Sequence, residues 1–118
     1  MRIQYHQNCW QNSNLEQMMK KYYVQERHKN KLLEIIHKEL PGCKVYLFGS
    51  RARGDHQEGS DIDLALDIGR PLEIREIGRI KEKIEETTIP QTVDIADLHT
   101  ASEKFKQEIE NEGILWEN

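Results

Sequence analysis

The chain has 118 residues, of which 36% are apolar and 32% are charged, with a formal net charge of −4 and a pI near 5.7. This length allows one globular domain, and the acidic balance argues against direct nucleic-acid binding, which favours a basic face. The sequence shows no run of 18 apolar residues, no signal-peptide pattern and no CxxC pair, so we expect a cytoplasmic protein with reduced cysteines and no membrane contact.

The first 20 residues differ from the rest because they are rich in glutamine and asparagine and show no hydrophobic period. We interpret residues 1–20 as an N-terminal arm, either mobile or ordered only on a partner, and residues 21–118 as the folded domain. A helix is predicted from about Tyr22 to Leu40, where apolar residues recur at helical spacing, and Pro41-Gly42 ends it.

Two predicted strands follow this helix, with a polar loop between them. Lys44–Phe48 is a short run of β-forming residues that leads into Gly49-Ser50. Asp61–Asp67 is a second apolar run that also carries carboxylates, and ten residues separate Ser50 from Asp61. The chain therefore turns at a glycine and returns to the sheet as a strand with acidic side chains.

The remaining elements alternate between helix and strand. A helix is predicted from Gly69-Arg70-Pro71 to about Glu86, and a third strand over Thr92–Ala96. A last helix begins where Thr100 and Glu103 have the spacing of a capping box, and Ile114-Leu115-Trp116 is expected to fold back onto the core. This order predicts an α/β (α+β) domain, with helices packed on a small three-stranded sheet.

The alternation of side chains along the strands gathers the acidic residues on one face. Asp61 and Asp63 are two residues apart in one strand, so they point the same way, while the apolar residues of that strand point the other way. Asp94 alternates with apolar neighbours in the third strand in the same manner, whereas Asp97 turns to the apolar side. If the apolar faces pack against helices, Asp61, Asp63 and Asp94 share the opposite, open face.

These carboxylates are candidate metal ligands and catalytic residues. Ionised pairs at about 5 Å repel by about 3 kcal/mol at an effective dielectric near 20, and a cation removes that cost. Oxygen ligands suit Mg²⁺ or Mn²⁺, and two such ions can clamp a phosphoryl group. Alone, a DxD pair is typical of a solvated strand and Gly-Ser is typical of a turn, but their combination with Asp94 favours catalysis.

The turn between the first two strands supplies a matching phosphate site. Gly49 lets the backbone approach a ligand closely, and exposed N–H groups with the Ser50 hydroxyl can hold phosphate oxygens. Arg51 and Arg53 are candidate nucleotide-binding residues because guanidinium groups suit phosphate. Contact with a partner and plain surface charge are alternatives for these two arginines.

The spacing Gly49-Ser50, ten residues, Asp61-x-Asp63 is similar to the signature of the DNA polymerase β-like nucleotidyltransferase superfamily. The string from Gly49 to Gly54 followed by Ser60-Asp61-Ile62-Asp63-Leu64 resembles its minimal nucleotidyltransferase branch. The resemblance runs from about Tyr22 to the end and is weaker around Asp94. It implies a mixed sheet flanked by helices. Asp61 and Asp63 would bind metal, Asp94 would assist the second ion and activate the acceptor hydroxyl, and Gly49 and Ser50 would hold the triphosphate.

The same resemblance implies Mg²⁺-dependent, in-line transfer of a nucleoside monophosphate, AMP from ATP, to a hydroxyl group. The short chain lacks the domains with which larger relatives hold base and acceptor, so we expect another protein to complete the site. The minimal branch is often paired with HEPN-type toxins, which implies an antitoxin that adenylylates a toxin tyrosine within a hetero-oligomer. Two alternatives are transfer to a small molecule, such as an aminoglycoside, and neutralisation of the partner by contact alone.

Overall fold

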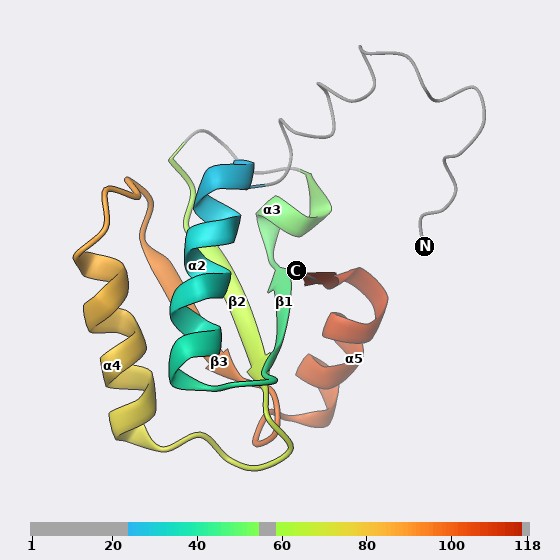
Figure 1. Cartoon of the computed structure of the whole chain (residues 1–118). Coiled ribbons are helices and arrows are strands. Elements are labelled where there is room, and N and C mark those ends of the chain that lie inside the picture. The colour runs from blue at the N-terminus through green and yellow to red at the C-terminus, as the bar shows by residue number, and fades with distance from the viewer. Residues whose placement is uncertain (1–23, 55–58, 117–118) are drawn as a thin grey trace.

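The computed structural model describes residues 24–54 and 59–116 (Figure 1). The predicted arm over residues 1–20 lies outside the described residues, so it stays a prediction, as does the domain boundary at residue 21. The described elements, in chain order, are α2 (Glu26–Glu39), β1 (Lys44–Phe48), α3 (Ser50–Arg53), β2 (Ile62–Asp67), α4 (Ile74–Glu85), β3 (Val93–Asp97), α5 (Glu103–Glu112) and β4 (Ile114–Trp116).

The sheet is mixed, with the strand order β3-β2-β1-β4. β1 pairs antiparallel with β2, and β2 pairs parallel with β3. The expectation of three strands was wrong, because Ile114–Trp116 does more than fold back: it forms β4, which pairs antiparallel with β1 and sets Tyr46 opposite Leu115. The mixed α/β architecture is confirmed, with a fourth strand that the sequence pattern did not indicate.

One face of the sheet holds the apolar core. Val45 and Leu47 of β1 and Leu64 and Leu66 of β2 are fully buried, and the strand register sets them side by side. Helices α2 and α4 cover this face, and α2 contributes the fully buried Leu32, among others (Figure 1). Burial of one such side chain stabilises the fold by about 1.5–3 kcal/mol. The predicted apolar face is therefore confirmed as the side on which the helices pack.

Helix α5 lies against the other face of the sheet. The ring of Phe105 meets the ring of Phe48 edge to face, with centroids 5.0 Å apart, and Phe48 is paired with Asp63 in the register. Ala65, on the same face, is fully buried. The acidic face is therefore covered near β1 and open towards β3, where Asp94 is exposed.

The start of α5 differs from the prediction. Ser102, not Thr100, is the N-cap, and its hydroxyl accepts a hydrogen bond from the Phe105 N–H at 3.2 Å. Thr100 lies two residues before that cap, because the helix begins at Glu103, and its hydroxyl donates to Asp97 at 3.1 Å instead. A capping box does occur in the chain, but at the start of α4, where Glu73 and Glu76 cap each other.

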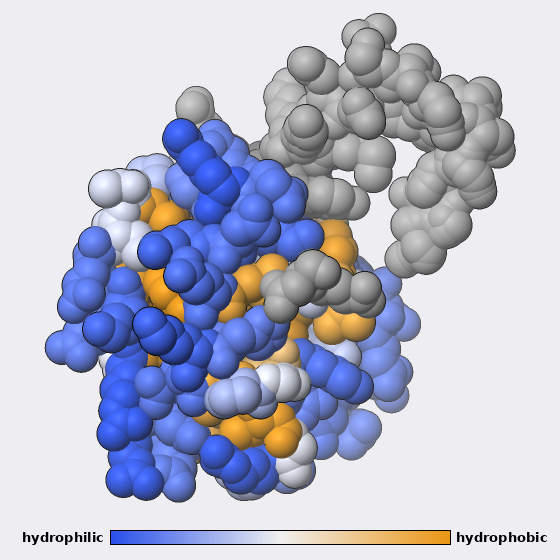
Figure 2. Space-filling view, in the orientation of Figure 1, coloured by the Kyte–Doolittle hydropathy of each residue, from blue (hydrophilic) through white to orange (hydrophobic). Residues whose placement is uncertain are grey.

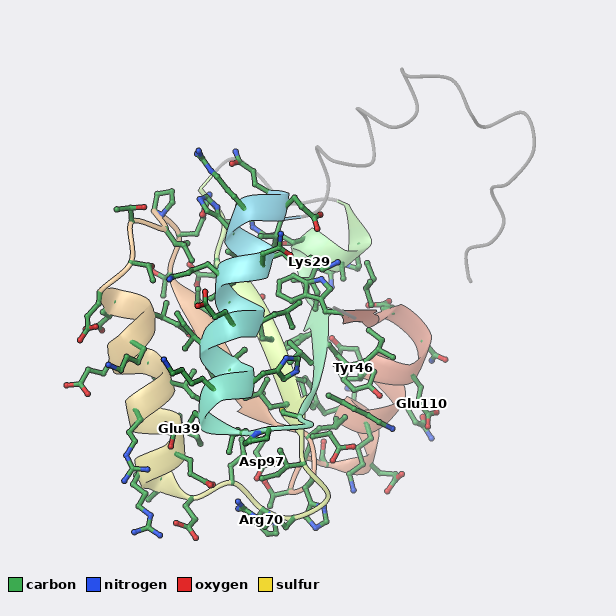
Figure 3. The ribbon with its side chains drawn as sticks, in the orientation of Figure 1. Lys29, Glu39, Tyr46, Arg70, Asp97 and Glu110 are labelled. Atoms are coloured by element: carbon green, nitrogen blue, oxygen red, sulfur yellow. The ribbon has the colours of Figure 1, made fainter. Side chains whose placement is uncertain are left out.

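The surface that Figure 2 shows is dominated by hydrophilic side chains, with small apolar patches between them. A salt bridge joins α2 and α4, the two helices that cover the apolar face, since Arg79 donates to Glu39 at 2.9 Å. Figure 3 shows Glu39 at the end of α2 that faces α4. None of the helices in the described ranges is long and apolar enough to cross a membrane.

Candidate active site

The three predicted carboxylates gather at one end of β2 and β3. Asp63 and Asp94 are direct partners in the parallel register, and neighbouring strands lie about 4.8 Å apart. Asp61 immediately precedes the first residue of β2 and is exposed, while Asp63 is half-buried. Because Asp63 and Asp94 occupy paired positions, their side chains leave the same face of the sheet next to each other.

The electrostatic state of Asp63 reflects this crowding. Burial raises the pKa of the Asp63 carboxyl above its ordinary value of 3.8, and the negative charges of Asp94 and Asp61 raise the pKa further. The positive charge of Arg53 acts in the opposite direction but is the weakest of these influences. The site therefore carries unbalanced negative charge, which a cation would relieve.

The donor chemistry of these residues fits a hard divalent cation, since carboxylate oxygens are the ligands that Mg²⁺ and Mn²⁺ prefer. Within the described residues, however, no group of three or more His, Cys, Asp or Glu side chains is arranged to hold a metal ion as it stands. The backbone places the carboxylates together, and their side chains would have to turn towards a common point on binding.

Gly49 brings the turn after β1 into contact with this acidic site. Its φ of 78° and ψ of −157° belong to a region that is essentially restricted to glycine. A Cβ atom at this position would collide with Asp63 Oδ2 and lie 3.3 Å from Asp63 Cγ. The Gly49 carbonyl also accepts bonds from the Ala52 and Arg53 N–H groups, both at 3.1 Å, which starts α3 directly after the turn. The predicted phosphate turn thus lies beside the central carboxylate.

The two candidate arginines have different environments. Arg51 is buried, with 6% of the residue exposed, and its Nε donates to the Ser60 carbonyl oxygen at 3.1 Å. The Arg53 side chain is 41% exposed, and its Nη1 lies 3.7 Å from Glu112 Oε1 of α5. Plain surface charge is therefore wrong for Arg51, whereas Arg53 is placed where its charge reaches Asp63.

Asp97 is the alternative to Asp94 as the third carboxylate of the site, but it has a structural role at the other end of β3. It accepts hydrogen bonds from the Leu72 N–H, the His99 N–H and the Thr100 hydroxyl, at 3.0, 3.0 and 3.1 Å. Figure 3 shows Asp97 at the same end of the molecule as Arg70, at the start of α4. Its carboxylate ties two loops together, so Asp94 is the better candidate for chemistry.

A cavity of about 410 Å³ next to Asp94 was not foreseen from the sequence. Its lining includes Lys81 and Glu85 of α4 and the loop that carries Gln91 and Thr92. The Gln91 Oε1 atom is buried and has no hydrogen-bond partner among the described residues. The helix-breaking Pro90 was the sole signal of this loop in the sequence, and it says nothing about a cavity.

Comparisons with known proteins give a consistent result. A family model for polymerase beta nucleotidyltransferases matches residues 30–116. A probable protein adenylyltransferase of Haemophilus influenzae, MntA, is 37% identical over 73 residues, which are 62% of this chain and 64% of that protein. The match thus spans just under two thirds of that relative. The protein adenylyltransferase MntA of Shewanella oneidensis is 28% identical over 95 residues, covering 79% of this chain and 68% of the relative.

Solved structures with the same fold come from toxin–antitoxin complexes. A crystal structure of a toxin–antitoxin with AMP-PNP contains a chain that is 27% identical, with a TM-score of 0.65 and coverage of 76% of this chain and 73% of that one. A chain of the toxin–antitoxin complex MntA–HepT is 25% identical, with a TM-score of 0.61 and coverage of 80% and 74%. Residues 30–116, which the family model matches, contain the turn and the three candidate carboxylates.

Proposed function

The chain belongs to the polymerase beta nucleotidyltransferase family, and we propose that it transfers AMP from ATP to a hydroxyl group of a partner protein. The observation that carries the proposal is the contact between the Gly49 turn and Asp63, which is itself paired with Asp94. Phosphoryl transfer depends on positioning of the phosphates and on metal ions that neutralise their charge, and a glycine turn beside two neighbouring carboxylates suits both tasks.

We propose that Asp61, Asp63 and Asp94 hold divalent cations, with two Mg²⁺ ions as the expectation and Mn²⁺ as an alternative. When bound, these ions would neutralise charge on the transferred phosphoryl group. The support is the raised pKa of Asp63, caused by burial and by the charges of Asp94 and Asp61, together with an all-oxygen donor set.

The strand order supports a direction for the proposed reaction across the sheet. Gly49 follows β1, Asp63 lies on the adjacent β2, and Asp94 lies on β3 beyond it. With the β- and γ-phosphates held at the Gly49-Ser50 turn, and with Arg53 near them, the leaving group lies on the β1 side. In-line displacement requires the attacking oxygen on the opposite side, so the acceptor hydroxyl approaches from β3. Asp94 is then placed to accept the proton of that hydroxyl.

The open part of the acidic face is where a partner would complete the site. It is covered by α5 near β1 but exposes Asp94 towards β3. We propose that the partner is a HEPN-type toxin, that its acceptor is a tyrosine, and that this chain acts as the antitoxin in a hetero-oligomer. The toxin–antitoxin complexes among its structural relatives support this partner, and the use of ATP, a cytoplasmic metabolite, supports a cytoplasmic location.

One observation favours a second candidate function. Chains with the same fold are found in toxin–antitoxin complexes, and such a complex also suits an antitoxin that neutralises its partner by contact alone. Transfer to a small hydroxylated molecule, such as an aminoglycoside, differs from both candidates in its acceptor. The three functions can be separated in one experiment.

The experiment is to incubate the chain with ATP labelled in its α-phosphate, Mg²⁺ and a HEPN-type toxin of the same genome. Covalent label on a toxin tyrosine, located by mass spectrometry, supports the proposal. Inhibition of the toxin without label supports contact alone, and label on an added aminoglycoside supports the small-molecule acceptor.

Two matched variants make this assay specific to the site. Asp63→Asn should abolish transfer, while Asp67→Asn, the same change four residues further along β2, should retain it. Equal transfer by wild type and Asp63→Asn would overturn the assignment of the site.

A further inference from the structure

Arg51 occupies an unusual place for a charged residue of a phosphate-binding turn. It lies in the first turn of α3, directly after Ser50, yet 6% of the residue is exposed. Its Nε donates to the Ser60 carbonyl oxygen at 3.1 Å. A phosphate ligand needs its guanidinium at the surface of the site, whereas Arg51 is a buried residue whose Nε is engaged by a backbone carbonyl.

The contact joins the two halves of the candidate active site. Arg51 is adjacent to Ser50, which would hold phosphate, and Ser60 is adjacent to Asp61, the first carboxylate. The two residues are nine positions apart in the sequence. We propose that Arg51 is a positioning residue that fixes the phosphate turn relative to the carboxylates, and that it does not bind phosphate itself.

The neighbours of Arg51 support an inward-facing charge. His28 of α2 is buried, and its pKa is lowered by burial first and then by the positive charges of Arg27 and Arg51. The Arg51 charge is therefore near enough to α2 to act on His28. Burial also lowers the pKa of the Arg51 guanidinium, although an arginine stays protonated in a protein.

The chemistry explains why an arginine would be used for this task. The guanidinium is a rigid, planar fork with several donors, whereas a lysine offers a single flexible ammonium group. Catalytic groups must be held within about 0.5 Å of the productive geometry by side chains that are themselves locked. A buried charged donor that holds the backbone carbonyl of Ser60, next to Asp61, meets that requirement.

The test compares Arg51→Lys with wild type, and uses Arg75→Lys as the control because Arg75 is an exposed arginine far along the chain. The first measurement is amide hydrogen exchange without metal or nucleotide. Arg51→Lys should accelerate exchange at residues 50–53 and 60–62 by about tenfold, which corresponds to about 1.4 kcal/mol. Amides of the buried strand pair β1–β2, such as that of Leu64, should keep their wild-type rates and so exclude global unfolding.

The second measurement, which rests on the proposed function, is binding of ATP and of Mn²⁺. Arg51→Lys should weaken Mn²⁺ binding in the presence of ATP by about tenfold, because the turn and the carboxylates are no longer fixed relative to each other. It should change ATP binding in EDTA by less than threefold, because the substitution removes no phosphate contact. The reverse pattern, with weak ATP binding in EDTA and unchanged exchange rates, would show that Arg51 is a phosphate ligand and overturn the inference.

The two measurements test different statements, so one can be refuted without the other. A wild-type protein that binds neither ATP nor Mn²⁺ would refute the proposed function, and the exchange data would still decide whether Arg51 fixes the turn. Unchanged exchange at residues 60–62 in Arg51→Lys would refute the positioning role even in an active enzyme. If Arg51→Lys does not fold, Arg51→Gln, which keeps a planar amide donor, takes its place in the same comparison.

Discussion

Gly49 and Asp63 are in contact across the first two strands, so that the turn has no room for even one extra methyl group. The backbone at Gly49 adopts a conformation that other residues avoid, and the missing side chain leaves space for the Asp63 carboxylate. The contact links the conformation of a loop to the position of a candidate metal ligand.

Gly49→Ala is therefore expected to destabilise the fold by about 3 kcal/mol or more, from backbone strain and from the collision with Asp63. Gly42→Ala is the matched control, because Gly42 also has a positive φ but a Cβ there meets nothing within 4 Å. The free energy of unfolding of Gly42→Ala, measured in urea, should be lower than that of wild type by about 1–2 kcal/mol. If the collision matters, Gly49→Ala will cost about 1 kcal/mol less in an Asp63→Ala background than in wild type.

Asp63→Asn should leave the metal-free fold as stable as wild type or more stable, since it removes a carboxylate that is crowded by Asp94 and Asp61. The same variant should lose Mn²⁺ binding, measured by calorimetry. Asp67→Asn is the control on the same strand, where the carboxylate accepts a bond from the Gly69 N–H at 2.9 Å. A loss above about 1 kcal/mol in EDTA for Asp63→Asn would contradict the repulsive cluster.

The raised pKa of Asp63 also predicts a pH dependence of stability. Because the pKa is higher in the folded state than in the unfolded state, the folded protein binds more protons between the two values. The contribution of Asp63 to the free energy of unfolding therefore falls as the pH rises from about 3.8 through the pKa of the folded state. This contribution is most favourable at low pH. Urea unfolding of wild type and Asp63→Asn in EDTA should show the wild type losing stability relative to the variant across this window. If the free energies of unfolding of the two proteins change in parallel with pH, the prediction is refuted.

Substitutions of Asp94 and Asp97 should have different effects, the first on nucleotide transfer and the second on the free energy of unfolding. Asp97→Asn is expected to lose about 1–3 kcal/mol of unfolding free energy, since its carboxylate holds three donors from two loops. Asp94→Asn, at an exposed position, should change stability by less than about 0.5 kcal/mol and lose nucleotide transfer. The opposite pattern would return the third catalytic position to Asp97.

The sequence indicated the faces of the strands better than their number. Lys44–Phe48 was predicted to the residue because β-forming residues stand there between two glycine turns. The acidic face followed from alternation, which has a fixed period in any strand. β4 was missed because three residues carry too little pattern, and its pairing with β1 is decided by tertiary contact. The cap of α5 was misplaced because the helix begins at Glu103, two residues later than the spacing of Thr100 and Glu103 predicted, which makes Ser102 the N-cap.

Arg51 shows why part of the site also lay beyond sequence reasoning. Its neighbours Gly49, Ser50 and Arg53 made a phosphate contact the natural hypothesis for a charged residue. Whether a side chain turns to solvent or to the interior depends on what packs against it, and here Arg51 is a buried residue whose Nε meets the Ser60 carbonyl oxygen. Composition and spacing do not contain that information.

The position of β4 in the sheet has a consequence for the newly made protein. The strands that carry the candidate carboxylates are complete at Asp97, but one edge of β1 stays unpaired until Ile114–Trp116 has been synthesised. An exposed strand edge is a template for pairing with other chains, and incompletely folded intermediates are where such pairing begins. β4 thus protects the edge of a strand that is synthesised well before it, and truncation before Ile114 should yield a protein that aggregates through β1.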